Sequence, residues 1–353
     1  MNDYLKGRGA QLNTLNRFLK QLYAEEHIEG IDVPLLTNEK TQFLLEYPKT
    51  IVNKVDSPDL SLMYSLNPYQ GCEHGCAYCY ARNVHQYWGL SAGLDFERKI
   101  IVKPDAPRLL EDFLMHPKWK PVPISLSGNT DCYQPAERKF QITRSLLEVF
   151  LKYKHPVSII TKNSLILRDL DILKELAKQN LVHVMISVTG LNEQLRSLME
   201  PRTASYANRL HEIASLNNAG IPCGVMNAPI IPGLNSEEIP SVIKAAAECG
   251  AVAAGYTVVR LNGAVKEIFH DWLYKNLPDK ADKVWHQIQA CHGGEVSDSQ
   301  FGRRMRGEGP ESEAIRNLFK LSVKKYMPDK QRIQLDCTLF KRPAKHGQMD
   351  LFE

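Results

Sequence analysis

The chain has 353 residues, of which 43% are hydrophobic and 24% are charged, and its formal net charge at pH 7 is +4. This is the composition of an ordinary globular protein, which excludes collagen-like repeats, coiled coils and wholesale disorder. So small a positive charge does not by itself indicate a nucleic-acid-binding protein. The apolar stretches, such as residues 221–231, are too short and too often interrupted by Gly, Pro or Asn to cross a membrane. Residues 1–10 lack the apolar segment of a signal peptide, so we expect a cytoplasmic protein with no membrane partner.

Three regions follow from the pattern of apolar residues. Residues 1–60 form an N-terminal extension with one predicted helix over 12–26, residues 61–265 form a core, and residues 266–353 form a mainly helical C-terminal region with a polar tail. Within the core we predict strands over 60–66, 123–127, 157–161, 182–188, 221–231 and 252–261, and helices over 137–154, 169–179, 192–200, 206–218 and 236–249, the last with Ser236 as its N-cap. This alternation indicates right-handed crossovers and a parallel sheet. Six such units are fewer than the eight of a closed barrel, so the predicted fold is α/β, a partial (β/α)6 TIM-like barrel.

In such a sheet the chemistry is expected at the carboxyl ends of the strands, where the connecting loops meet. Polar residues follow the predicted strands at these ends, and we expect them to converge on one opening: Asn67, Ser127 to Asp131, Lys162, Ser187, Thr189, Asn227 and Arg260. Taken singly, a lysine or serine in such a place is more often an ordinary surface or strand-end residue than a ligand. Their shared position is what makes them candidates.

The cysteines are the most informative residues. Of eight, three fall within eight residues directly after the first strand of the core, as Cys72, Cys76 and Cys79. This Cys-x3-Cys-x2-Cys spacing lets three thiolates each bind one iron of a cubane cluster, and the missing fourth cysteine leaves one iron with an open coordination position. The alternative is a zinc site completed by His74 or His85. Zinc sites favour a second Cys-x2-Cys pair, which this chain lacks, so the spacing favours the iron–sulfur cluster.

The string Asn67-Pro-Tyr-Gln-Gly-Cys-Glu-His-Gly-Cys-Ala-Tyr-Cys-Tyr-Ala-Arg82 resembles the cluster motif of the radical SAM superfamily. It is similar in particular to the "DNA repair photolyase"-like subgroup related to spore photoproduct lyase, and further stretches agree with that subgroup: 7–10, 130–137, 160–162, 200–202 and 301–309. The resemblance implies a [4Fe–4S] cluster whose open iron binds S-adenosylmethionine (SAM). Reductive cleavage of SAM would then give a 5′-deoxyadenosyl radical that abstracts hydrogen from the substrate. An electron donor such as flavodoxin or ferredoxin is implied as a partner.

The resemblance also implies roles for individual residues toward SAM. Tyr78 matches the aromatic residue that meets the adenine, and the turn of Gly128, Asn129 and Thr130 matches the glycine-rich turn that contacts the methionine amino group. The remaining SAM contacts implied are Lys162 for the carboxylate, Ser187 for the ribose, and Arg202 as a second candidate for the carboxylate, because a guanidinium binds a carboxylate bidentately.

One departure from the lyase bears on the substrate. Spore photoproduct lyase has a hydrogen-donating cysteine at the position where this chain has Gly128. Cys132 lies four residues later, and it could act as the donor only if its loop turned it inward; otherwise it is a buried, inert thiol. This departure argues against spore photoproduct itself as the substrate. Another nucleic-acid lesion is one candidate substrate, and a peptide or small molecule is the alternative. A non-catalytic iron–sulfur or zinc-binding adaptor is a third interpretation, although an electron carrier would offer four cysteine ligands per cluster.

The C-terminus ends with two adjacent large apolar residues after a polar stretch. The string of Gln348, Leu351 and Phe352 is similar to the short motif by which bacterial replication and repair proteins bind the DNA sliding clamp. A sliding clamp is thus a predicted partner. The alternative is that both apolar side chains fold back onto the chain's own core.

Overall fold

The computed structural model describes residues 5–18, 40–60, 63–328 and 333–342. Within these ranges the centre of the molecule is a sheet with the strand order β10-β9-β8-β7-β6-β3-β2. Its strands are β2 (Val52–Lys54), β3 (Tyr64–Leu66), β6 (Ile124–Leu126), β7 (Val157–Thr161), β8 (Val182–Ser187), β9 (Cys223–Ile230) and β10 (Ala254–Val258). Neighbours from β3 to β10 pair in parallel, and β2 pairs antiparallel with β3. The described strands thus form the predicted six-stranded parallel array, open between β10 and β2.

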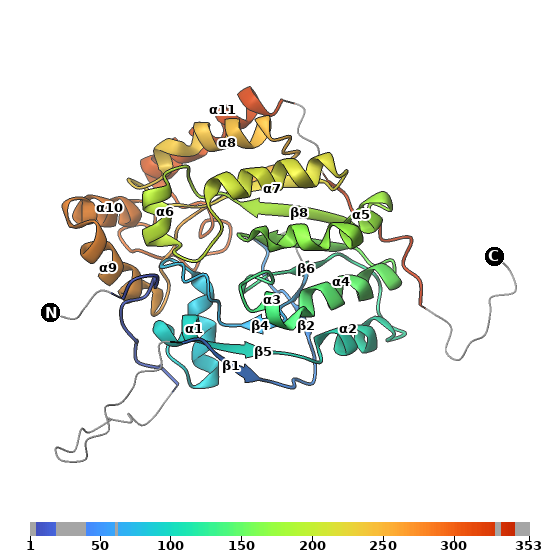
Figure 1. Cartoon of the computed structure of the whole chain (residues 1–353). Coiled ribbons are helices and arrows are strands. Elements are labelled where there is room, and N and C mark those ends of the chain that lie inside the picture. Colours follow the sequence, from blue (N-terminus) through green and yellow to red (C-terminus); the bar gives the residue numbers. More distant parts are fainter. Residues whose placement is uncertain (1–4, 19–39, 61–62, 329–332, 343–353) are drawn as a thin grey trace, which may run out of the picture.

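Helices cover the outside of this sheet and follow one another from the bottom to the top of Figure 1. They are α2 (Ala106–Leu114), α4 (Ile142–Lys152), α5 (Leu170–Lys178), α7 (Tyr206–Asn218) and α8 (Ile239–Glu248). Apolar side chains of these helices and of the strands form one continuous core. The arrow of β8 points to the left in Figure 1, so the carboxyl ends of the parallel strands lie on that side.

The prediction of one continuous helix over 137–154 is wrong. Two helices stand there, α3 (Glu137–Phe140) and α4, and Gln141 between them adopts a left-handed conformation with φ of 52°. The Glu137 carboxylate accepts hydrogen bonds from the backbone N–H groups of Thr143 (3.0 Å) and Arg144 (3.3 Å). A buried acidic side chain thus satisfies the first N–H groups of the second helix, which stabilises a break that local propensity does not reveal.

The expected N-cap at Ser236 is also corrected. A short 3₁₀ helix, Ser236–Glu238, precedes α8, and Glu238 is the residue at the N-cap of α8. Pro240 lies in the first turn of α8, where a missing N–H removes no intrahelical hydrogen bond. The proline therefore places the start of the α-helix after Ser236.

The described part of the N-terminal extension is not helical over residues 12–18, and the rest of the predicted helix 12–26 lies outside the described residues. Thr14 accounts for part of this difference, because its backbone N–H donates to the Ser91 hydroxyl at 2.8 Å. Asn16 donates to the carbonyls of Gln86 (2.8 Å) and Leu90 (3.0 Å). The extension also supplies β1 (Gln42–Leu45) to a second sheet of order β1-β5-β4, with β5 at Lys99–Val102 and β4 at Tyr69–Gln70.

A loop over residues 298–306 spans the open side of the sheet. The carbonyl of Met305 accepts a hydrogen bond from the N–H of Val258, the last residue of β10, at 3.0 Å. At the other edge, between β2 and β3, Asp59 accepts from the guanidinium of Arg304 (2.5 Å) and from the N–H of Gly302 (2.5 Å). The loop therefore joins the two edges that the strands leave unpaired.

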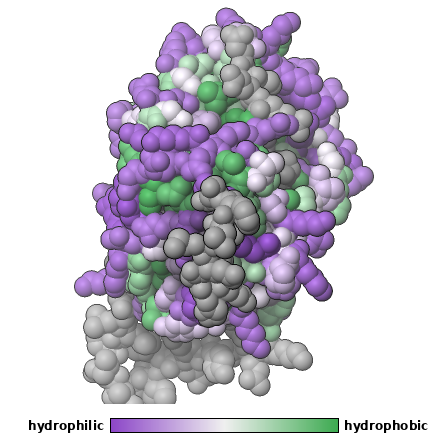
Figure 2. All heavy atoms as spheres, turned by 90° about the vertical axis from the view of Figure 1, so that its right-hand side faces the viewer, coloured by the Kyte–Doolittle hydropathy of each residue, from purple (hydrophilic) through white to green (hydrophobic). Residues whose placement is uncertain are grey.

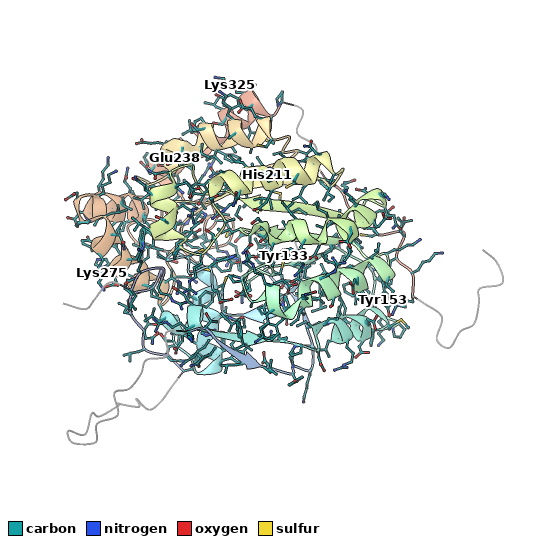
Figure 3. All side chains as sticks on the ribbon, viewed as in Figure 1. Tyr133, Tyr153, His211, Glu238, Lys275 and Lys325 are labelled. Atoms are coloured by element: carbon teal, nitrogen blue, oxygen red, sulfur yellow. The ribbon has the colours of Figure 1, made fainter. Side chains whose placement is uncertain are left out.

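The described part of the C-terminal region contains the helices α9 (Val265–Asn276), α10 (Pro278–Ala290) and α11 (Gly309–Tyr326). Beyond them, residues 333–342 lie at the amino ends of the strands. There the N–H of Lys341 donates to the carbonyl of Tyr153 (3.1 Å), and Tyr153 marks this end on the right of Figure 3. Figure 2 shows this end mainly hydrophilic, with small apolar groups between polar ones.

Gln348, Leu351 and Phe352, the residues of the sliding-clamp prediction, lie outside the described residues. In the described residues we find no helix with the length and apolarity that a membrane span requires.

Glu212 on α7 gives the fold a testable pH dependence. Its carboxylate is fully buried and has no hydrogen-bond partner among the described residues. Burial raises its pKa to about 8, against the opposing charge of Arg209. Because the folded-state pKa lies above the ordinary value of 4.5, stability is expected to fall as pH rises from 4.5 to about 8.

The substitution Glu212→Gln removes the ionisable carboxyl group and is expected to raise the free energy of unfolding at pH 7 by about 3 kcal/mol. Urea denaturation of both proteins between pH 5 and pH 9 measures the difference. The gap should widen with pH and level off above about pH 8. Parallel pH profiles for the two proteins would contradict the assignment.

Candidate functional site

A cavity of about 380 Å³ lies at the carboxyl ends of the parallel strands. The three clustered cysteines line it: Cys72, Cys76 and Cys79. It is also lined by six of the residues predicted to contact SAM: Tyr78, Gly128, Asn129, Thr130, Lys162 and Ser187. Cys72 and Ser187, which are 115 positions apart in the sequence, thus meet at one opening. This convergence follows from the sheet, because parallel strands bring their carboxyl ends to the same edge.

The cysteine loop is fixed by backbone hydrogen bonds to distant segments. The N–H of Cys72 donates to the carbonyl of Phe96 at 2.8 Å, and the N–H of Ala77 donates to the carbonyl of Met199 at 3.0 Å. Cys79 is the residue before the 3₁₀ helix Tyr80–Trp88. Gly75 has φ of +68°, and a Cβ there would lie 2.9 Å from a carboxylate oxygen of Glu97. Glycine is therefore required at the tip of the loop.

A fully buried ion pair, Arg82–Glu97, supports the loop from behind at 2.6 Å. Arg82 also donates from Nε to the carbonyl of Cys76 at 2.9 Å. Glu97 accepts from the N–H groups of Gly9 (3.3 Å) and Ala10 (2.8 Å), so the N-terminal segment completes the arrangement. Residues 7–10 agree with the family resemblance, which implied no role for them. They thus support the cysteine loop.

Burial keeps the free thiols protonated. It raises the pKa of Cys72 well above its ordinary value, and it raises the pKa of Cys79 as well. Burial and then the charge of Glu200 raise the pKa of Cys76 to about 12, while Lys162 acts in the opposite direction. Metal binding to such thiols releases their protons, so Lys162 favours the thiolate form that a metal requires.

The two histidines of the zinc alternative are not placed as ligands beside the thiols. His74 is buried, its Nδ1 lies 3.4 Å from Asp131 Oδ2, and its Nε2 lies 3.1 Å from Asn163 Nδ2. Burial lowers the pKa of His74 to about 4, so its ring is neutral at pH 7. His85 is buried without lining the cavity. Among the described residues, no three Cys, His, Asp or Glu side chains are close enough to share one metal ion. Three thiols bordering a wider space suit a multinuclear cluster better than a single zinc ion.

Tyr78 is held by a buried charged network. Its hydroxyl donates to Glu200, whose carboxylate also accepts from Thr189 Oγ1 (3.0 Å) and from Arg209 Nη2 (2.5 Å). Glu200 and Arg209 are both fully buried. Burial alone would raise the pKa of Glu200, but the charges of Arg209 and Lys162 lower it to about 2. The network fixes the ring of Tyr78 at the cavity wall. The sequence analysis assigned no function to Glu200 and Arg209.

The turn after β6 is tied to the segment that precedes the cysteine loop. The N–H of Asn129 donates to Asn67 Oδ1 at 2.8 Å, and the Thr130 hydroxyl donates to the carbonyl of Tyr69 at 2.5 Å. A Cβ on Gly128 would lie 2.7 Å from the Cβ of Ser65, so only glycine allows this approach. Because the Thr130 hydroxyl is already engaged, the backbone of the turn is the better candidate for ligand contact.

Two of the residues predicted to contact SAM have side-chain polar groups that are uncommitted, which means that they make no hydrogen bond or ion pair with the described residues. The ammonium of Lys162, which follows β7, makes no hydrogen bond or ion pair with the described residues. The hydroxyl of Ser187, the last residue of β8, has no hydrogen-bond partner there either, although the Ser187 carbonyl accepts from Arg209 at 2.9 Å. Asp131 holds Lys162 in place, because it accepts from the Lys162 N–H (2.8 Å) and from Thr161 Oγ1 (2.8 Å). Asp131 is a residue whose role the sequence did not reveal.

Arg202 and Cys132 are not among the cavity-lining residues. Arg202 donates from its backbone N–H to the carbonyl of His74 at 3.3 Å, so it lies beside the cysteine loop rather than in the cavity. Cys132 is fully buried, its carbonyl accepts from Thr143 Oγ1 (2.6 Å), and burial raises its thiol pKa well above the ordinary value. Its neighbour Tyr133, in the centre of Figure 3, donates to Asp169 at 3.1 Å. This packing is typical of a structural thiol.

Comparison with known proteins identifies the family. Residues 66–246, about half of the chain, match the family model described as the radical SAM superfamily. The chain is 32% identical over 234 residues to an uncharacterized protein of Mycobacterium tuberculosis, covering 65% of this chain and 69% of that protein. It is 29% identical over 197 residues to an uncharacterized protein of Methanocaldococcus jannaschii, covering 56% of this chain and 71% of that protein.

Two solved structures share the fold. A mutant of spore photoproduct lyase has a TM-score of 0.62 at 15% identity, covering 83% of this chain and 82% of that chain. The same enzyme complexed with dinucleoside spore photoproduct gives the same TM-score, identity and coverage. At this identity the likeness shows the fold alone. Together with the match over residues 66–246 and the three cysteines at the cavity, it is the expected architecture of the family. The chain belongs to the radical SAM superfamily.

Proposed function

We propose that the cavity binds a [4Fe–4S] cluster through Cys72, Cys76 and Cys79 and binds SAM beside it. The family implies both groups. The observation that carries the proposal is that the three thiols, Lys162 and Ser187 line the same cavity of about 380 Å³. When bound, the cluster and SAM supply an electron and the 5′-deoxyadenosyl group that removes hydrogen from a substrate. An external electron donor such as flavodoxin or ferredoxin would reduce the protein.

The chain's own residues then bind and orient SAM. The uncommitted ammonium of Lys162 would pair with the carboxylate, and the uncommitted hydroxyl of Ser187 would bind the ribose. Tyr78, fixed by Glu200, would contact the adenine, and the backbone of residues 127–130 would accept a hydrogen bond from the amino group. Arg202 is less suited to this contact than Lys162, because it does not line the cavity.

For the substrate we propose a nucleic acid and a lyase-like reaction. The support is the shared fold with an enzyme whose structure contains a dinucleoside spore photoproduct. The buried position of Cys132 argues against that lesion as the substrate here, because a hydrogen donor must reach the reacting atoms. A peptide or small-molecule substrate remains the alternative. An adaptor without catalysis would not need the cavity space beside the thiols.

Lys162→Ala and Ser187→Ala test the SAM site. Each is expected to weaken SAM binding by about 1.5–3 kcal/mol, roughly 10- to 150-fold, because each removes a hydrogen bond to a charged or buried group. Equilibrium dialysis of the anaerobically reconstituted protein without reductant measures the dissociation constant. Lys178→Ala is the matched control, since Lys178 is an exposed lysine of α5 that pairs with Glu175. Unchanged affinity in both variants, with full cluster loading, would refute the two assignments.

A further inference from the structure

Arg260 is a second cation of the cavity, separate from Lys162. It follows β10, whereas Lys162 follows β7, and both side chains line the cavity. Lys162 acts on the pKa of Cys76 and Glu200, so it lies on the side of the cluster ligands. The groups whose charges act on the pKa of Arg260 are instead Arg304, Tyr80, Asp59 and Asp298. The cavity therefore has positive charge at two different places.

The guanidinium of Arg260 is half-buried and makes no hydrogen bond or ion pair with the described residues. The carboxylates that could neutralise it are already engaged, since Asp59 binds Arg304 (2.5 Å) and Asp298 binds Arg303 (2.5 Å). Burial and the positive charge of Arg304 lower the pKa of Arg260. A half-buried charge without a partner is costly, and an anionic ligand would offset that cost.

The neighbouring cavity wall suits a nucleotide. Tyr80 lines the cavity and is 49% exposed, and its hydroxyl donates to the carbonyl of Gly128 at 2.9 Å, which fixes the side chain there. Met226 and Met305 line the same cavity and add apolar surface. Proteins that bind single-stranded nucleic acid usually combine an arginine that binds a phosphate with a nearby aromatic ring that stacks on a base.

We propose that Arg260 binds a backbone phosphate of a nucleic-acid substrate and that Tyr80 stacks on an adjacent base. The proposal rests on the proposed function, because it places this substrate next to the SAM site of the same cavity. Arg304 is not the phosphate ligand, since its guanidinium is occupied by Asp59 and Ser57. Arg260 is the cation of this part of the cavity that is free to bind, within the described residues.

The test uses the full chain with reconstituted cluster and a fluorescein-labelled single-stranded oligothymidylate as the probe. Fluorescence anisotropy at several salt concentrations is expected to show binding that weakens about tenfold or more in Arg260→Gln. The slope of log affinity against log salt should become shallower by about one, as expected for the loss of one phosphate contact. Arg260→Lys, which keeps the charge, should restore part of the affinity.

Arg138→Gln is the matched control, because Arg138 is an exposed arginine of α3 outside the cavity. Tyr80→Leu should weaken binding of the oligonucleotide, and cluster absorbance checks that the adjacent Cys79 still binds. Equal binding by Arg260→Gln and the unmodified protein would overturn the proposal, as would binding of poly-glutamate as strong as that of the oligonucleotide. Failure to bind any oligonucleotide would overturn this proposal and the proposed nucleic-acid substrate with it, whereas SAM affinity, measured in parallel, tests the proposed cluster and SAM site separately.

Discussion

Cys76→Ala is expected to abolish binding of the [4Fe–4S] cluster, and Cys72→Ala and Cys79→Ala should have the same effect. Three thiols are the minimum set for a cluster with one open iron, so losing one leaves two ligands for four irons. The buried loop offers no replacement, because both ring nitrogens of His74 already face Asp131 and Asn163. Iron content per chain and the visible absorbance after anaerobic reconstitution measure the loss.

Cys249→Ala is the matched control for these variants. Cys249 is a half-buried thiol that does not line the cavity, so its replacement should leave iron content and absorbance unchanged. Full iron loading in the variant that lacks all three clustered cysteines would show that the cluster is bound elsewhere.

Arg209→Leu is expected to destabilise the protein by about 3–5 kcal/mol, because it leaves the buried carboxylate of Glu200 without its partner. The two side chains are fully buried and 2.5 Å apart. In the unmodified protein the pKa of Glu200 is lowered from 4.5 to about 2, so its contribution to stability is present above pH 4.5 and is lost as pH falls toward 2. Urea denaturation at pH 7 measures the effect.

The control for this variant is Arg108→Leu, whose exposed pairs with Asp105 and Asp112 should contribute little to stability, because water screens them. The Arg209 variant should also bind SAM more weakly, since Glu200 then no longer fixes the Tyr78 ring. A loss of stability no larger than that of the control would contradict the role given to this ion pair.

The elements that the sequence predicted well are those governed by local pattern and burial. The predicted strand 157–161 and helix 206–218 coincide with β7 and α7. In β7 four of the five residues are β-branched, and buried and half-buried positions alternate. The helix α7 begins after Ser205, whose side chain accepts from the N–H of Asn208. Such signals lie within the segment itself, so a single sequence suffices to find them.

The elements that were missed depend on distant partners. The 298–306 loop joins β10 to Asp59 across the open side of the sheet, and no local pattern indicates that Arg304 pairs with a residue 245 positions away. The break at Gln141 depends on the buried carboxylate of Glu137, which also contacts Tyr69 and Arg168. Tertiary contacts of this kind override local propensity.

The same distinction holds at the site. The strand-end position of Lys162, Ser187 and Arg260 could be predicted, because topology alone brings those ends together. Which side chains are free to bind a ligand could not be predicted. Thr130 is engaged by the Tyr69 carbonyl while Lys162 is not engaged, and that difference arises from packing between separate segments. The roles of these residues toward SAM remain predictions.

Reductive cleavage of SAM is the most direct test of the central claim. Anaerobically reconstituted protein, supplied with SAM and a low-potential reductant, is expected to release 5′-deoxyadenosine and methionine in equal amounts, measured by liquid chromatography and mass spectrometry. The Cys76→Ala protein should release neither above the level of the protein-free control, and Cys249→Ala should match the unmodified protein. A fully loaded cluster with bound SAM but no 5′-deoxyadenosine under any reductant would contradict the account, and so would release that persists without the three cysteines.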